Sequence, residues 1–144
     1  MVYFRWFSKA FPDDTGFPVF NLFWAATLFE NNKIPEAIQK AYETAFSNTY
    51  LLDLINGKDP VQLDKSETIG YENLEYAKQV YKDCINFITL EFQIWISNLS
   101  EFDDFKANMN KFISIQKLIK DEPVGHMRTN LIQESYKLEN QLTG

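Results

Sequence analysis

The sequence predicts an all-α protein, an antiparallel bundle of four main helices plus a terminal helix. Five glycines and five prolines are few for 144 residues, so long uninterrupted elements are expected. Apolar residues recur at three- and four-residue steps through most of the chain, as on the buried face of a helix. Short polar turns separate these stretches, and short connections favour antiparallel neighbours.

The chain 1–144 is expected to fold as a single domain. Domains commonly hold about 100–200 residues, and no repeat or flexible linker divides this sequence. A composition of 45% hydrophobic and 24% charged residues excludes intrinsic disorder and low-complexity structure. An amphipathic, aromatic N-terminal segment over 1–11 is separated from the first main helix by the turn residues of 12–16.

The first two main helices are each expected to begin near a proline, which suits the first turn of a helix. The first spans 18–31 and ends at a pair of asparagines. The second spans 35–56, and Gly57 should cap it in the left-handed conformation. A loop over 57–68 follows, in which Asp64 and Glu67 resemble a capping box that leads into the third helix.

The third and fourth helices share a stretch without glycine or proline, from Tyr71 to Pro123. This stretch is too long for one helix of a globular protein, so an internal break is expected. Residues 97–100, Ser-Asn-Leu-Ser, provide capping side chains, and the acids that follow suit a helix N-terminus. The expected helices are therefore 70–98, 101–121 and, at the C-terminus, 126–142.

The region 87–96 leaves a second fold class open. Ile88, Leu90 and Phe92 begin an alternating pattern rich in β-branched and aromatic residues, which is typical of a strand. Its only candidate partner is the segment 2–7, giving an α+β alternative with one short pair of strands. We favour the helix, because an isolated pair of strands is marginally stable.

The charge of the chain argues against nucleic acid as a partner. The net charge is −6, and Arg5 and Arg128 are the only arginines, the residue type that best recognises phosphate and guanine. Four lysines between 105 and 120 occur without an acid. We interpret them as a solvated helix end, with a docking strip for an acidic partner as the alternative.

Residues for catalysis and metal binding are scarce. His126 and Cys84 are the only histidine and cysteine, which leaves too few ligands for zinc and no Glu-x-x-His motif for a di-metal site. Cys84 lies on an apolar helix face, where burial makes a thiol unreactive. We therefore expect no metal, no cofactor and no enzymatic activity. A single cysteine and the lack of a recognisable secretion signal predict a cytoplasmic protein.

One short stretch resembles a known family. The run LEYAKQVY at Leu74–Tyr81, preceded by Lys58-Asp59-Pro60, is similar to a stretch of phasins, the helical proteins that coat polyhydroxyalkanoate granules. The resemblance implies a helical fold and contact with a granule surface. It is confined to these two segments, and we do not assign the chain to that family.

The aromatic content of 16% motivates the leading functional hypothesis. Ten rings fall within residues 1–30, more than the core of the predicted bundle requires. Aromatic side chains are enriched at protein interfaces, so we expect a non-catalytic interaction protein that binds a partner or forms a homo-oligomer. The candidate residues are Tyr3, Phe4, Trp6, Phe7, Phe11, Phe20, Phe23 and Trp24.

Three other interpretations of these rings stay open. The segment 1–11 could fold back and plug the core of the bundle. With Arg5 and Lys9 among its rings, it could instead lie on a membrane or on a lipid or polymer granule. An apolar small molecule could also occupy the bundle interior. The residues of that third site would be Phe20, Phe23, Trp24, Phe92 and Trp95.

Overall fold

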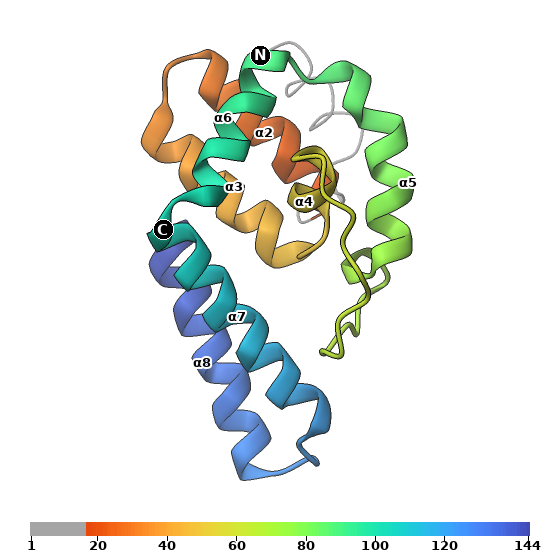
Figure 1. Cartoon of the computed structure of the whole chain (residues 1–144). Helices are drawn as coiled ribbons and strands as arrows, with labels where there is room; N and C mark the ends of the chain where they lie inside the picture. Colours follow the sequence, from red (N-terminus) through yellow and green to blue (C-terminus); the bar gives the residue numbers. More distant parts are fainter. Residues whose placement is uncertain (1–16) are drawn as a thin grey trace.

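The computed structural model describes residues 17–144, and every regular element in that range is helical, which confirms the all-α fold class (Figure 1). The region 87–96 is not a strand, and its proposed partner 2–7 lies outside the described residues. The helices are α2 (Pro18–Glu30), α3 (Ile34–Ser47), α4 (Leu51–Ile55), α5 (Leu74–Cys84), α6 (Leu90–Glu101), α7 (Asp103–Asp121) and α8 (His126–Thr143), with 3-10 turns η2 (Gly70–Glu72) and η3 (Ile85–Phe87).

The helices form a cluster of shorter elements and a long hairpin (Figure 1). In the cluster, α2 packs along α3, and α4 contacts both α5 and α6. The hairpin consists of α7 and α8, and it contacts the cluster through α3 and α6. The C-terminal part of α8 lies beside α3, whereas the turn between α7 and α8 points away from the cluster.

The predicted helix 35–56 is wrong in one respect, because it is interrupted at Asn48. The backbone of Asn48 is extended, with φ −152° and ψ 111°. Its side-chain Nδ2 donates to the carbonyl oxygens of Tyr71 and Asn73, each at 2.9 Å. Its Oδ1 accepts from the backbone N–H groups of Tyr50 and Leu51 at 2.9 and 3.1 Å. The asparagine replaces helical hydrogen bonds with contacts to a distant segment.

Of two other predictions for this region, the cap at Gly57 is confirmed and the capping box is wrong. Gly57 has φ +80° and ends α4 as expected for a left-handed cap. The predicted capping box of Asp64 and Glu67 is wrong, because Asp64 pairs with Lys120 and Glu67 with Lys65.

The predicted helix 70–98 is also interrupted. The helix α5 ends at Cys84, and after η3 the chain is extended at Ile88, with φ −105° and ψ 141°. Thr89 then caps α6, since its side chain accepts from the N–H of Phe92 at 3.1 Å. Ile88 and Thr89, two of the β-branched residues behind the strand alternative, therefore lie at the break between α5 and α6.

The break predicted at 97–100 lies inside α6 and was placed too early. The Ser100 hydroxyl donates to the carbonyl oxygen of Ile96 at 2.8 Å, so it binds its own helix and caps nothing. The chain turns at Phe102 instead, where ψ is 138°. The remaining helices, predicted over 18–31, 101–121 and 126–142, are confirmed to within two residues at each end.

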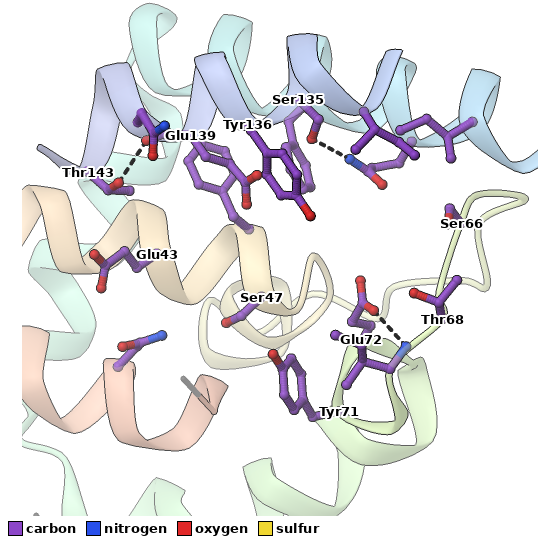
Figure 2. A pocket seen from close by; sticks show the side chains of 18 of the residues that line it. Glu43, Ser47, Ser66, Thr68, Tyr71, Glu72, Ser135, Tyr136, Glu139 and Thr143 are labelled. Atoms are coloured by element: carbon purple, nitrogen blue, oxygen red, sulfur yellow. Dashed lines mark hydrogen bonds between the residues drawn. The ribbon is translucent and has the colours of Figure 1, made fainter. Parts of the chain in front are cut away.

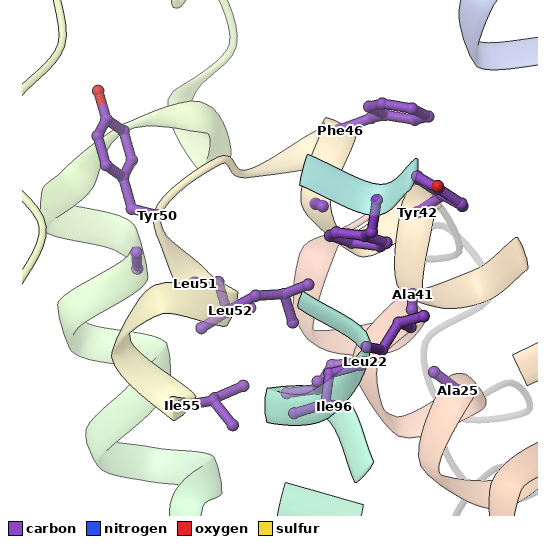
Figure 3. Close-up of a cluster of buried hydrophobic side chains, with 14 of the residues drawn as sticks. Leu22, Ala25, Ala41, Tyr42, Phe46, Tyr50, Leu51, Leu52, Ile55 and Ile96 are labelled. Carbon is purple, nitrogen blue, oxygen red and sulfur yellow. The ribbon is translucent and has the colours of Figure 1, made fainter. Parts of the chain in front are cut away.

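The main core lies where α2, α3, α4 and α6 meet (Figure 3). Ala25 of α2 and Ala41 of α3 are both 0% exposed, and their small side chains let the two helices approach closely. Aromatic stacking then joins α3 to the hairpin. The rings of Tyr42 and Phe105 lie 4.5 Å apart, and those of Phe46 and Phe112 lie 4.6 Å apart. These contacts fix the position of α7 beside α3.

A group of polar side chains holds the loop between α4 and η2 and is called the saturated cluster below. The Tyr50 hydroxyl donates to Glu67 and accepts from the Gln62 side chain and the Leu63 N–H. Lys65, only 5% exposed, pairs with Glu67 at 2.9 Å and lies 5.1 Å from the Tyr50 ring. Asn48 joins the cluster through its bond to the Tyr50 backbone. The saturated cluster consists of Asn48, Tyr50, Gln62, Lys65 and Glu67.

Candidate binding cavity

A cavity of about 580 Å³ lies between α3, α8 and the residues that lead into η2 (Figure 2). Its apolar lining includes Phe46 of α3, Phe112 of α7 and Ile132 of α8. The cavity is partly open to solvent, and its polar lining comes mainly from α8 and from residues 66–72. Volumes of about 300–1,000 Å³ are typical of small-molecule sites.

Three glutamates from three elements line this cavity: Glu43 of α3, Glu72 of η2 and Glu139 of α8. Glu43 is neutralised by Lys40, whose Nζ lies 2.6 Å from its carboxylate. Glu72 accepts one hydrogen bond through Oε1, from the N–H of Ile69 at 2.8 Å. Figure 2 shows Glu72 and Glu139 on opposite walls of the cavity.

The carboxyl group of Glu139 has an unfavourable environment. Burial, followed by repulsion from Glu72, raises the pKa of Glu139 from 4.5 to about 6. The same two acids act on Tyr71, because burial and then the charges of Glu72 and Glu139 raise the pKa of its phenol. No residue of the described chain neutralises Glu139, so the electrostatic potential of the cavity is negative near this side chain.

The cation that lines the cavity is Arg128, and its guanidinium is already engaged. It donates to the carbonyl oxygens of Ile119 and Glu122, the latter at 3.2 Å. These carbonyls lie at the C-terminal end of α7, where an arginine satisfies acceptors that the helix leaves open. Arg128 thus stabilises the α7–α8 turn, and it does not lower the pKa of Glu139.

The side chain of Asn21 is the most unusual polar group at this site. It lines the cavity from α2 and is only 5% exposed, yet its amide has no hydrogen-bond partner among residues 17–144. The amide atoms of Asn21 are not among the fully buried unsatisfied atoms of residues 17–144, so they can be reached from the cavity and are available to a molecule in it. By contrast, the neighbouring Ser135 hydroxyl is satisfied by Gln116 at 2.8 Å.

The aromatic residues that the sequence singled out lie elsewhere. Tyr3, Phe4, Trp6, Phe7 and Phe11 fall outside the described residues. The structure distributes the others over two groups of rings and brings none of them to the cavity.

The first group lies between α2 and α3. The rings of Phe20 and Trp24 meet edge to face at 5.5 Å, and the Lys40 ammonium lies 3.5 Å from the Trp24 ring. In the second group, Phe92 and Trp95 of α6 pack on Phe29 of α2 at 5.8 and 5.0 Å. Phe20 and Phe92 are 2% and 0% exposed, so both contribute to the interior, and Phe23 is partly buried against the same core.

Sequence reasoning missed the residues that define the cavity. In the sequence, Glu72 has the spacing of an ordinary surface acid, because Glu75 follows three positions later. Tyr136 and Glu139 share the same three-residue spacing on α8. Nothing in the sequence indicates that residues 71–72 and 136–139 face one another, since that depends on the position of the hairpin.

A separate feature is the exposed apolar face of α6. Leu90 and Ile94 are 66% and 53% exposed, and their four-residue spacing places them on one face of α6, while Phe87, 63% exposed, precedes the helix in η3. Glu101 lies on the same face two turns beyond Ile94 and is bridged by Lys58 and Lys106 at 3.2 and 2.7 Å. These are the residues of the α6 face discussed below.

The described chain offers little reactive chemistry. Burial raises the pKa of the Cys84 thiol to about 11, which keeps it protonated and unreactive. Among residues 17–144, no three His, Cys, Asp or Glu side chains lie close enough together to hold a metal ion. In the same range, every helix is too short or too polar to cross a bilayer.

Comparison with protein families, with curated proteins and with solved structures yields no match to this chain.

Proposed function

We propose that this is a non-catalytic binding protein that takes up a small molecule in the cavity between α3 and α8. The observation that carries the proposal is the Asn21 side chain, which lines a cavity of about 580 Å³ and whose amide has no hydrogen-bond partner among residues 17–144. Glu139 lines the same cavity, and no base of the described chain neutralises its carboxylate. This supports the proposal, because leaving the polar groups of Asn21 and Glu139 unpaired reduces the stability of the protein. Sites that lower the stability of a protein in this way typically bind a ligand.

A substitution that fills the cavity tests this proposal. Ser47 lines the cavity at the end of α3, and Ser47→Phe would occupy part of its volume. Ser114→Phe is the matched control, since Ser114 is exposed on α7 and outside the lining. In a fragment screen by ligand-observed NMR, we expect fragments that bind wild type and Ser114→Phe but not Ser47→Phe. The proposal fails if Ser47→Phe binds the same fragments, or if no fragment binds the wild type.

A second candidate function, self-association, has its own support in the α6 face. Leu90 and Ile94 on one face of α6, with Phe87 just before the helix, are large apolar side chains more than half exposed, which is typical of an interface. The partner that we propose is a second copy of this chain, because an antiparallel copy of α6 would bring the acid at one end of each helix toward the lysines at the other end of its partner. Glu91 lies at the N-terminal end, while the exposed Lys58 and Lys106 lie at the C-terminal end on either side of Glu101.

Two copies of α6 packed antiparallel about a two-fold axis would pair these ends. Leu90 and Ile94 of one copy would cover Ile94 and Leu90 of the other, and Glu91 would approach the partner's lysines. Light scattering after size exclusion tests this. We expect a dimer that Ile94→Asp converts to a monomer, while Val124→Asp, at an isolated residue that is 96% exposed, stays dimeric. A wild type that is monomeric at high concentration would exclude the candidate.

A further inference from the structure

We propose that the cavity recognises an organic cation, whose ammonium group lies between Glu72 and Glu139 and whose apolar part rests on Phe46 and Phe112. This inference rests on the proposed function, since it assumes that the cavity binds a small molecule. It is carried by the chemistry of the lining, considered below from its charges, its buried amide and its rings.

The charges of the lining select the sign of the ligand. Glu72 and Glu139 come from opposite walls and lie close enough for Glu72 to disfavour ionisation of Glu139. Lys40 is paired with Glu43, and Arg128 donates through one nitrogen to backbone carbonyls at the α7–α8 turn. Among residues 17–144, an anion would meet two carboxylates with Arg128 as the one base of the lining, whereas a cation would relieve the repulsion between Glu72 and Glu139.

The buried amide provides a further contact for an ammonium group. The Asn21 carbonyl oxygen is an acceptor with two lone pairs, and no residue of the described chain donates to it. An ammonium group has three donors, so it can bind two carboxylates and keep a donor for a further acceptor of the lining.

The remaining lining favours an organic body. Among residues 17–144, the carboxylates of this cavity do not form a group of three or more side chains that could hold a metal ion. The rings of Phe46 and Phe112 lie 4.6 Å apart and give the cavity an apolar wall. Tyr71 and Tyr136 add aromatic faces near the acids, where a cation is attracted by the ring quadrupole. An alkyl chain that ends in an ammonium group fits both parts.

Three probes with the same six-carbon body test the inference: hexylammonium, 1-hexanol and hexanoate, each titrated into the full chain at pH 7.5. We expect hexylammonium to bind at least about tenfold more tightly than 1-hexanol, as a charge-assisted hydrogen bond requires. Hexanoate should bind more weakly than either. NMR shift changes should map to the cavity, and Ser47→Phe should abolish them.

Variants of the two carboxylates provide the decisive comparison. Glu72→Gln and Glu139→Gln should each weaken hexylammonium binding by about tenfold and leave 1-hexanol binding unchanged. Glu75→Gln is the control, because it removes the same charge from an exposed position of α5 outside the lining. Circular dichroism verifies that the variants are folded.

The outcomes separate this inference from the function on which it rests. If 1-hexanol or hexanoate binds in the cavity as tightly as hexylammonium, the cation inference is wrong and the binding function stands. If Glu75→Gln weakens binding as much as the cavity variants do, the effect is one of net charge and the inference is also wrong. If none of the three probes reaches the cavity, the inference is wrong, and the fragment screen with Ser47→Phe decides the function separately.

Discussion

Two acidic regions lie on either side of the residues that lead into η2, and they differ in how their charges are compensated. In the saturated cluster, Glu67 accepts from Tyr50 and Gln62 and pairs with the buried Lys65. In the cavity, Glu139 has no base, and Glu72 repels it. The pKa values move in opposite directions. Burial alone would raise the pKa of Glu67, but the hydrogen bonds of its partners lower it, whereas that of Glu139 rises to about 6.

This difference separates a structural acid from a binding acid. A carboxylate whose oxygens are all satisfied by the protein stabilises the fold and has nothing left to offer a ligand. A carboxylate that the protein leaves unpaired reduces stability and gains from any cation that arrives. The comparison therefore predicts opposite effects for similar substitutions in the two regions, given next in order of decreasing magnitude.

The largest effect is expected at Asn48, which anchors the saturated cluster to the backbone. Asn48→Ala removes four hydrogen bonds at a residue that is 1% exposed and leaves their backbone partners unsatisfied. We expect the free energy of unfolding to fall by about 3 kcal/mol, measured by urea denaturation. Asn86→Ala, at an exposed position of η3, should change it by less than about 0.5 kcal/mol. Equal effects of the two substitutions would contradict the role given to Asn48.

A smaller loss is expected for Glu67→Gln, because it leaves the ammonium of Lys65 buried without its counter-charge. The predicted cost is about 2 kcal/mol at pH 7. The pKa of Glu67 is lowered in the folded state, so its contribution is present above its ordinary value of 4.5 and is lost as the pH falls below that value. Urea denaturation at pH 7 and pH 3 measures both parts. A cost that did not shrink at pH 3 would show that the ion pair is not its source.

Binding of hexylammonium should depend on pH through Glu139. Its pKa of about 6 means that a proton competes with the ligand below that value. We expect the affinity to be constant above pH 7 and to fall by up to tenfold between pH 6 and pH 5, since one proton is displaced on binding. Isothermal titration calorimetry measures this, and Glu139→Gln should flatten the profile over the same range. A steep profile that persisted in Glu139→Gln would assign the titration to another group.

The smallest effect, of opposite sign to that at Glu67, is expected for the stability of Glu139→Gln. A raised pKa in the folded state means that the wild type loses stability as the pH rises from about 4.5 to about 6. The glutamine variant lacks this loss and should be more stable than wild type by about 1 kcal/mol at pH 7.5, allowing for solvent screening. Below pH 4.5 the two proteins should have equal stability. Urea denaturation at pH 7.5 and pH 4 tests both statements, and a less stable variant at pH 7.5 would refute them.

The comparison also explains what the sequence could predict. Helical periodicity identified the regions of α2, α7 and α8, because their buried faces repeat over several turns. It missed the breaks at Asn48 and Thr89, since each depends on what the side chain binds. Asn48 is helix-compatible until its amide contacts Tyr71 and Asn73, which are distant in the sequence.

The cavity was not predictable for the same reason. Glu72 and Glu139 appear as ordinary surface acids when each is considered on its own helix. They become a pair only because the contact of the tilted Phe46 and Phe112 rings places the α7–α8 hairpin beside α3. Tertiary packing of this kind carries no local signal in the sequence. The abundance of rings was a valid observation, and in the described residues it serves to position the elements around the cavity.

The loop after α4 is held by hydrogen bonds at both of its ends, which makes it a suitable place to insert another domain. Asn48 binds Tyr71 and Asn73, and Tyr50 binds Leu63, so residues 59–61 lie within a loop whose two ends the protein itself holds together. Val61 is 73% exposed there. Because the entropy of closing a loop grows only slowly with its length, by about 0.6 kcal/mol per doubling, the chain should accept a fluorescent domain inserted after Asp59. Such a fusion would leave every residue that lines the cavity unchanged.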